Sequence, residues 1–262
     1  MSTPELAYRV DGALARILLS QPEKMNAMTF EMWSALPGCI ARAGADPAVR
    51  AIVLEGAGER AFCAGADISQ FGTRRSEPEA VAAYDQAVGA AMAALEGARK
   101  PTIALIRGIC FGGGFGLAMG CDIRLARDDS RFRVPAARLG LGYGFSGVKL
   151  IARKLGPDAT ADILISARIL DAAEAARLGV VAHVWSRESF ATESAAYLEA
   201  VASNAPLTLL AIKRALIELA QPEAAQESAA VEALVRQCFA SADYREGQAA
   251  FTEKRPPRFT GN

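Results

Sequence analysis

The sequence predicts an α/β fold in which buried strands alternate with helices, followed by a mostly helical C-terminal segment. Two short apolar runs, Ala51–Leu54 and Thr102–Ile106, have the length and composition of buried strands. Between them, apolar residues recur at steps of three and four over Pro78–Leu95, which is typical of an amphipathic helix. Alanine-rich patterns from about residue 157 to residue 253 indicate helices that pack on this core or on another subunit.

The N-terminal segment predicts a β-hairpin followed by a helix. Leu6–Val10 and Ala13–Leu19 flank the dipeptide Asp11-Gly12, which suits the positive φ angles of a tight two-residue turn. A helix is expected over residues 30 to about 43, and Thr29 is its expected N-cap.

A glycine-rich loop before a buried helix is the first feature that indicates chemistry. Gly112-Gly-Gly114 precedes a short apolar helix at Phe115–Met119, and a strand is expected at Asp122–Ala126. Glycines let a ligand approach the backbone, and the first N–H groups of a helix have no partners within it. Such a loop could bind a phosphate, stabilise an oxyanion, or simply allow tight packing of the helix. No Gly-Lys-Ser/Thr follows, which excludes a P-loop, and the glycine spacing does not fit a dinucleotide fingerprint.

The composition is that of an ordinary globular protein, with 52% hydrophobic and 22% charged residues. Lysine and arginine number 29 and are balanced by 29 aspartates and glutamates, so neither nucleic acid nor a membrane is expected as a partner. The five cysteines show no C-x-x-C spacing, which predicts free thiols and no metal site. The N-terminus lacks the basic and apolar regions of a signal peptide, so we expect a cytoplasmic protein.

Four segments, spread over nearly the whole chain, together resemble motifs of the enoyl-CoA hydratase/isomerase (crotonase) family. They are Gln21–Ala27, Ala61–Ile68, Gly112–Gly114 with Cys121-Asp122-Ile123, and Phe251–Pro256. The resemblance implies a crotonase-like (ClpP/crotonase) α/β spiral core of repeated ββα units over residues 1–200. It also implies a C-terminal helical trimerisation region over residues 201–262, so we expect a homotrimer or a dimer of trimers.

The same resemblance implies a site for an acyl-CoA thioester, with coenzyme A as part of the substrate and no separate cofactor. Its oxyanion hole would consist of the backbone N–H groups of Ala66 and Gly113, which stabilise the enolate oxygen more than the ground state. For the CoA moiety the resemblance indicates Lys24, the loop residues Ala64, Asp67 and Ile68, and the pair Phe251 and Lys254, which in relatives reaches a neighbouring subunit's CoA. Asp67 is also expected to organise its loop by accepting backbone hydrogen bonds.

The sequence departs from the family at two positions that carry the chemistry. Hydratases of this family use two glutamates, and the corresponding residues here are Gly116 and Ala136. Because each positioned acid/base group contributes roughly 10²–10⁴-fold in rate, we expect standard hydration to be impaired. A lyase of the hydratase/isomerase type that stabilises a thioester enolate is the family default.

Two alternatives stay open. The stretch around Tyr143 resembles the loop of methylmalonyl-CoA-type decarboxylases, in which a tyrosine lies near the reacting carboxylate. Loss of CO₂ forms the enolate without a base, so an oxyanion hole and one hydroxyl could suffice; Tyr143 could equally be an aromatic that shapes the acyl pocket.

Arg138 could bind an acidic acyl group or pair with a carboxylate, and His183 is expected to be structural. The alternative of another class is a non-catalytic acyl-CoA-binding protein.

Overall fold

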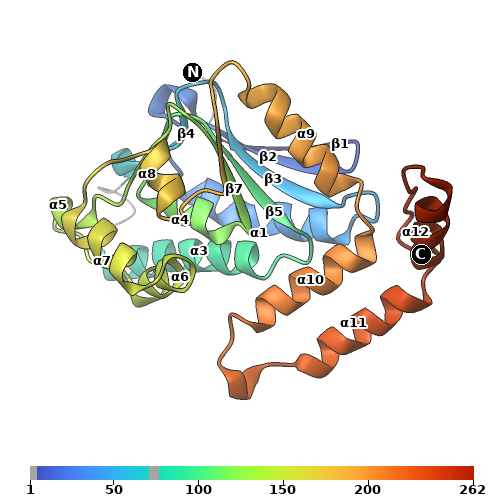
Figure 1. Cartoon of the computed structure of the whole chain (residues 1–262). Coiled ribbons are helices and arrows are strands. Elements are labelled where there is room, and N and C mark those ends of the chain that lie inside the picture. The colour runs from blue at the N-terminus through green and yellow to red at the C-terminus, as the bar shows by residue number, and fades with distance from the viewer. Residues whose placement is uncertain (1–4, 71–76) are drawn as a thin grey trace.

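The computed structural model describes residues 5–70 and 77–262, and it shows the expected hairpin at the N-terminus (Figure 1). Strands β1 (Glu5–Asp11) and β2 (Leu14–Ser20) pair antiparallel, with Asp11 opposite Leu14. The two turn residues are therefore Gly12 and Ala13, and the prediction that placed the turn at Asp11-Gly12 is wrong by one position. Of these two residues only Gly12 has a positive φ, of 57°. This fits a type II′ hairpin turn, which needs glycine at its first central position alone.

Helix α1 (Phe30–Ala45) begins where the sequence predicts. The Thr29 hydroxyl accepts a hydrogen bond of 3.2 Å from the backbone N–H of Met32, which satisfies one donor of the first helical turn. The inner face of α1 buries Met32, Trp33 and Leu36, and this face covers the sheet.

Two sheets form the core, and the larger has the order β1-β2-β3-β5-β7-β10. Apart from the hairpin, its neighbouring strands are parallel, and β3 and β5 are buried along their whole length, which explains their continuous apolar runs. The smaller sheet has the order β4-β6-β8-β9. The remaining strands are β3 (Ala51–Gly56), β4 (Ala61–Cys63), β5 (Thr102–Ile106), β6 (Ile109–Phe111), β7 (Ile123–Arg127), β8 (Arg131–Arg133), β9 (Leu170–Asp171) and β10 (His183–Trp185).

Three ββα units follow one another along the chain, and each advances by one strand in both sheets. The first is β3-β4 with α3 (Pro78–Glu96), the second β5-β6 with α4 (Gly113–Gly120), and the third β7-β8 with α5 (Ala136–Leu139). The predicted α/β core of repeated ββα units is thus confirmed. Because the units are stacked, the loop after β4 and the start of α4 come together at one edge of the small sheet.

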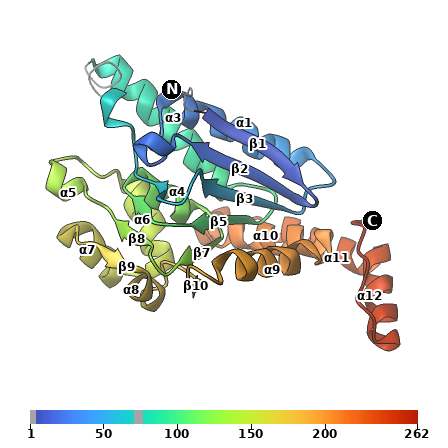
Figure 2. The same cartoon turned by 90° about the horizontal axis from the view of Figure 1, so that it is seen from above.

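From Phe145 onward the chain is mostly helical, with only the short strands β9 and β10 between the helices, as the alanine-rich pattern from about residue 157 predicts. Its helices are α6 (Phe145–Leu155), α7 (Pro157–Ser166), α8 (Ala172–Arg177), α9 (Phe190–Ala202), α10 (Pro206–Glu218), α11 (Ser228–Ala240) and α12 (Ala242–Glu253). Figures 1 and 2 show α11 and α12 extending away from the sheets. Within the described ranges no single helix is long and apolar enough to cross a membrane; α9 and α10 pass that test only as a pair bent by 98°.

Candidate active site

Two backbone N–H groups that have no partner within the described ranges lie close together where the loop after β4 meets the start of α4. A Cβ atom built on Gly113 would lie 3.6 Å from the nitrogen of Ala66, and one built on Gly65 would lie 3.3 Å from the nitrogen of Gly113. Neither Ala66 nor Gly113 donates a backbone hydrogen bond to a described residue. Gly113 is also the first residue of α4, where the helix dipole favours negative charge. The two residues expected to form an oxyanion hole are therefore neighbours with free donors.

The close approach of these segments depends on glycine. Gly65 has a φ of 110°, a conformation that residues with a Cβ atom rarely adopt. A Cβ on Gly114 would lie 2.3 Å from the carbonyl oxygen of Cys63, so α4 can rest directly on β4 only without one. The glycine-rich segments therefore do both things: they allow α4 to pack tightly on β4, and they leave the N–H of Gly113 without a partner in the described ranges.

A cavity with a volume of about 680 Å³, here called the central chamber, opens beside Gly113. Its walls come from α1, α3, the start of α4, the loop after α5 and α6, and most of the lining is apolar or glycine. The lining residues are Trp33, Asp85, Val88, Gly89, Met92, Ala93, Glu96, Gly112, Gly113, Gly116, Gly142, Tyr143, Gly144, Ser146, Gly147, Leu150 and Ile151. Ala66 is not in this wall but lies immediately beside Gly113.

The two positions at which the family resemblance expects glutamates differ in their surroundings. Gly116 lines the chamber, and a Cβ built there would meet nothing within 4 Å, so the place of a side chain is open space. Ala136 is partly buried at the start of α5 and is not among the lining residues. The carboxylates that do line the chamber, Asp85 and Glu96, lie on α3 and are absent from the sequence-based candidates. One sequence signal could have indicated Asp85: it lies three residues before Val88, and residues three apart share one face of a helix.

Tyr143 lies in the chamber wall, as a role in the site requires. Burial raises the pKa of its phenol to about 12, so the hydroxyl stays protonated at neutral pH. A Cβ on Gly147 would lie 2.8 Å from Cε1 of Tyr143, which shows how closely the ring packs on the start of α6. Arg138 is exposed, is absent from the chamber wall, and makes no ion pair with a described residue.

Lys24 and the loop that carries Ala66 are joined by an ion pair. Nζ of Lys24 donates hydrogen bonds of 2.8 Å to Asp67 Oδ2 and 2.7 Å to Ser69 Oγ. Asp67 Oδ1 accepts from the Ser69 backbone N–H and hydroxyl, at 3.0 and 2.7 Å, which confirms its predicted role in organising the loop. Burial by itself would raise the pKa of Asp67, but the hydrogen bonds from Lys24 and Ser69 hold it below its usual value.

The other loop residues expected at the CoA moiety lie beside this pair. The Ala64 N–H donates to the carbonyl of Met25 at 3.0 Å, which ties the loop to the segment that carries Lys24. Ile68, which follows the buried Asp67, is 65% exposed. The structure thus brings Lys24, Ala64, Asp67 and Ile68 together with Ala66.

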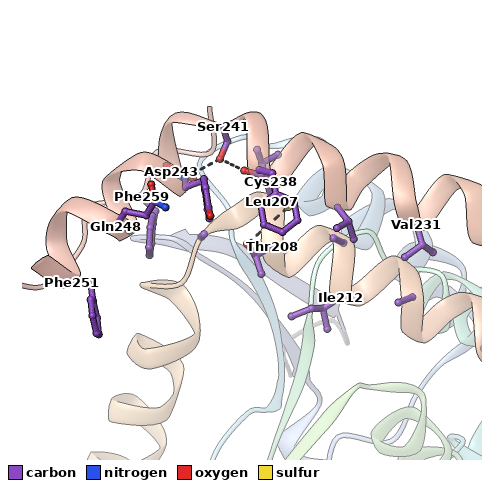
Figure 3. Close-up of a pocket in the computed structure, with 17 residues that line it drawn as sticks. Leu207, Thr208, Ile212, Val231, Cys238, Ser241, Asp243, Gln248, Phe251 and Phe259 are labelled. Atoms are coloured by element: carbon purple, nitrogen blue, oxygen red, sulfur yellow. Dashed lines mark hydrogen bonds between the residues drawn. The ribbon is translucent and has the colours of Figure 1, made fainter.

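Phe251 and Lys254 do not line the chamber of their own chain. Phe251 is 87% exposed on α12 and borders an apolar groove of about 660 Å³ between α10, α11 and α12 (Figure 3). Figure 3 shows its ring standing apart from Leu207 and Thr208 on α10.

His183 is exposed on β10, where its ring stacks on Trp185 at a centroid distance of 5.3 Å, and it is also absent from the chamber wall.

Comparisons with known proteins agree over nearly the whole chain. A family model described as enoyl-CoA hydratase/isomerase matches residues 9–262. A crotonyl-CoA hydratase from Syntrophomonas wolfei is 33% identical over 99% of each chain, and an (E)-benzylidenesuccinyl-CoA hydratase from Thauera aromatica is 31% identical over 98% of this chain and 99% of its own. The crystal structure of an enoyl-CoA hydratase/carnithine racemase from Magnetospirillum magneticum has a TM-score of 0.92 and 35% identity, and covers 100% of this chain and 97% of that one.

Proposed function

Because this chain belongs to the enoyl-CoA hydratase/isomerase family, we propose that it binds an acyl-CoA thioester in the central chamber and stabilises its enolate between the N–H groups of Ala66 and Gly113. The observation that carries the proposal is the pair of adjacent backbone donors beside the chamber, neither of which is paired with a described residue. As the α-carbon loses a proton or a carboxylate, negative charge moves onto the thioester oxygen, and fixed donors stabilise that charge without reorganising.

The CoA moiety extends along the loop from Ala64 to Ile68. The Lys24 ammonium has three N–H donors, of which Asp67 and Ser69 accept two, and its side chain is 46% exposed. The remaining donor can reach a phosphate oxygen while the other two fix the position of the ammonium group. Lys24 thus acts as an anchored point charge for the nucleotide. The exposed Ile68 offers an apolar surface next to it.

Hydration in this chamber proceeds slowly, because Gly116 and Ala136 supply no carboxylate. Decarboxylation of a malonyl-type thioester is a second candidate, and Tyr143 favours it. Its phenol lines the same chamber as Gly113 and stays protonated, so it can donate a hydrogen bond that orients the departing carboxylate. No base is needed in that reaction, since departure of CO₂ itself leaves the electron pair of the enolate.

A panel of acyl-CoA substrates tests the reaction. Crotonyl-, 3-enoyl-, malonyl- and methylmalonyl-CoA are incubated with the protein, and products are identified by mass spectrometry. Slow hydration of crotonyl-CoA is expected, and faster loss of CO₂ from a malonyl-type thioester would favour the second candidate. Efficient crotonyl-CoA hydration would contradict the argument from the missing glutamates. If no thioester reacts but acyl-CoA still raises the melting temperature, the protein is a binder rather than an enzyme.

The C-terminal helices are proposed to assemble with other copies of the chain. Ile212, Phe239 and Phe251 are 53%, 61% and 87% exposed along α10, α11 and α12, which is more apolar surface than a solvated helical arm normally presents. A trimer, or a dimer of trimers, would cover this face and carry Phe251 and Lys254 toward a neighbouring chamber. Light scattering coupled to size-exclusion chromatography tests it, and a monomer at micromolar concentration would contradict it.

A further inference from the structure

Resting on the proposed thioester site, we propose that Asp85 on α3 is the acid/base residue of the central chamber. Its carboxylate takes up the α-proton of the acyl group while the carbonyl oxygen lies between Ala66 and Gly113, and then returns it. This role falls to α3 because the positions of the family glutamates, Gly116 and Ala136, carry no ionisable group.

One face of α3 lines the chamber over three turns. The lining residues are Asp85, Val88, Gly89, Met92, Ala93 and Glu96, which recur at alternating steps of three and one, as a single helical face requires. Its two carboxylates are 11 residues apart, or roughly 16 Å at 1.5 Å per residue. They therefore serve opposite ends of the chamber.

The packing of α3 against α4 shows which end of α3 lies near Gly113. Tyr84, next to Asp85, accepts a hydrogen bond from Trp33 Nε1, and Trp33 Cζ2 lies 3.1 Å from the place of a Cβ on Gly113. Further along α3, Met92 Cε lies 3.2 Å from the place of a Cβ on Gly120. Helices α3 and α4 thus run side by side in the same sense, and the turn of α3 that carries Tyr84 and Asp85 is the one nearer Gly113.

The two carboxylates also differ in their partners. Glu96 is ion-paired with Arg153 at 2.9 Å, whereas the side chain of Asp85 makes no hydrogen bond or ion pair with any residue in the described ranges. The phenol of Tyr143 is a poor base at neutral pH, because burial raises its pKa to about 12. Of the two carboxylates in the described chamber lining, Asp85 is therefore the one whose side chain has no partner within the described ranges, which leaves its oxygens available to accept a proton.

The step balances without a further reactant. The Cα–H bond breaks, its electron pair forms the Cα–C1 double bond, and the C1–O π pair moves onto the oxygen that Ala66 and Gly113 stabilise. The proton goes to an oxygen of Asp85. In the reverse direction Asp85 returns a proton to Cα, or a deuteron once its carboxyl has exchanged with D₂O.

Exchange of the α-protons of butyryl-CoA in D₂O tests the assignment, because a saturated thioester can undergo no hydration. Deuterium uptake is followed by mass spectrometry for the full-length protein and for Asp85→Asn, Asp85→Glu and Glu79→Gln. Glu79 is an exposed carboxylate on the first turn of α3, outside the chamber wall, and serves as the matched control. Calorimetry gives the Kd of butyryl-CoA for each protein.

We expect Asp85→Asn to slow exchange at saturating butyryl-CoA by about 10²-fold or more, with its Kd within threefold of the parent. Asp85→Glu should recover part of the rate, and Glu79→Gln should match the parent. If the parent binds butyryl-CoA but does not exchange, or if Asp85→Asn exchanges as fast, the role of Asp85 is overturned while the thioester site stands. If the parent does not bind butyryl-CoA at all, both are overturned.

Discussion

Trp33 and Tyr84 join the two helices that enclose one side of the central chamber. Nε1 of Trp33 on α1 donates a hydrogen bond of 3.0 Å to the hydroxyl of Tyr84 on α3, and both side chains are almost fully buried. The Trp33 ring also lies against Gly113, so this pair fixes the distance between α3, which carries Asp85, and the start of α4.

Tyr84→Phe should destabilise the protein, because the buried N–H of Trp33 would lose its acceptor. We expect the free energy of unfolding in urea to fall by about 1–3 kcal/mol. Tyr8→Phe is the matched control, since the buried Tyr8 hydroxyl has no hydrogen-bond partner among the described residues and its removal should be neutral or slightly stabilising. Equal losses in the two variants would contradict the role given to the Trp33–Tyr84 bond.

Gly116→Glu should increase hydration of crotonyl-CoA. A side chain at this position enters open space in the chamber, and it replaces a helical glycine, so the variant should fold. A positioned carboxylate contributes roughly 10²–10⁴-fold, and we expect at least the lower part of that range in kcat. Gly116→Gln has the same shape without the charge and should show no gain. A similar gain in both variants would mean that shape, not the carboxylate, limits hydration.

Tyr143→Phe separates the two candidate reactions. If the phenol orients a departing carboxylate, the variant should lose turnover of malonyl-type thioesters while its affinity for acyl-CoA stays nearly unchanged. Because the pKa of Tyr143 is about 12, the parent rate should show no loss from ionisation of this group up to about pH 10. Unchanged decarboxylation in Tyr143→Phe would leave the ring with only a shaping role.

The sequence predicts the longer helices and strands well, because their signals lie in neighbouring residues. Thr29 caps α1, and α3 and β5 lie within a residue of their expected bounds, since amphipathic spacing and continuous apolar runs are read from neighbouring residues. The short strands β4, β6 and β8 escaped prediction because three residues carry too little periodicity.

The residues of the candidate site that belong to a sequence motif could be predicted. Those that reach the site through the packing of distant segments could not. Ala66 and Gly113 follow from glycine-bearing motifs, and the structure places them side by side. Asp85 has no motif; its place in the chamber depends on how α3 packs against α4 through Trp33 and Met92, a contact between segments far apart in the sequence. The pairing of Lys24 with Asp67 likewise joins residues 43 positions apart.

Lys154 gives the fold a defined pH dependence. Burial lowers the pKa of its ammonium to about 8, while the unfolded chain keeps the ordinary value near 10.5. Between these values the unfolded state binds more protons, so this residue makes the free energy of unfolding rise with pH from about 8 to about 10.5. Relative to Lys154→Met, the parent should gain stability across that window in urea titrations. A constant difference between the two proteins would contradict the lowered pKa.

The thioester carbonyl itself reports on the proposed hole most directly. Isotope-edited infrared spectroscopy of butyryl-CoA labelled with ¹³C at C1 measures the C=O stretch free and bound. Donation from Ala66 and Gly113 should shift the bound stretch to lower wavenumber than in water. Gly113→Ala should reduce the shift, because its methyl group would lie 3.6 Å from the Ala66 nitrogen and 3.1 Å from Trp33 Cζ2, which would disturb the arrangement of the two donors. A bound carbonyl that keeps its frequency in water would contradict the account.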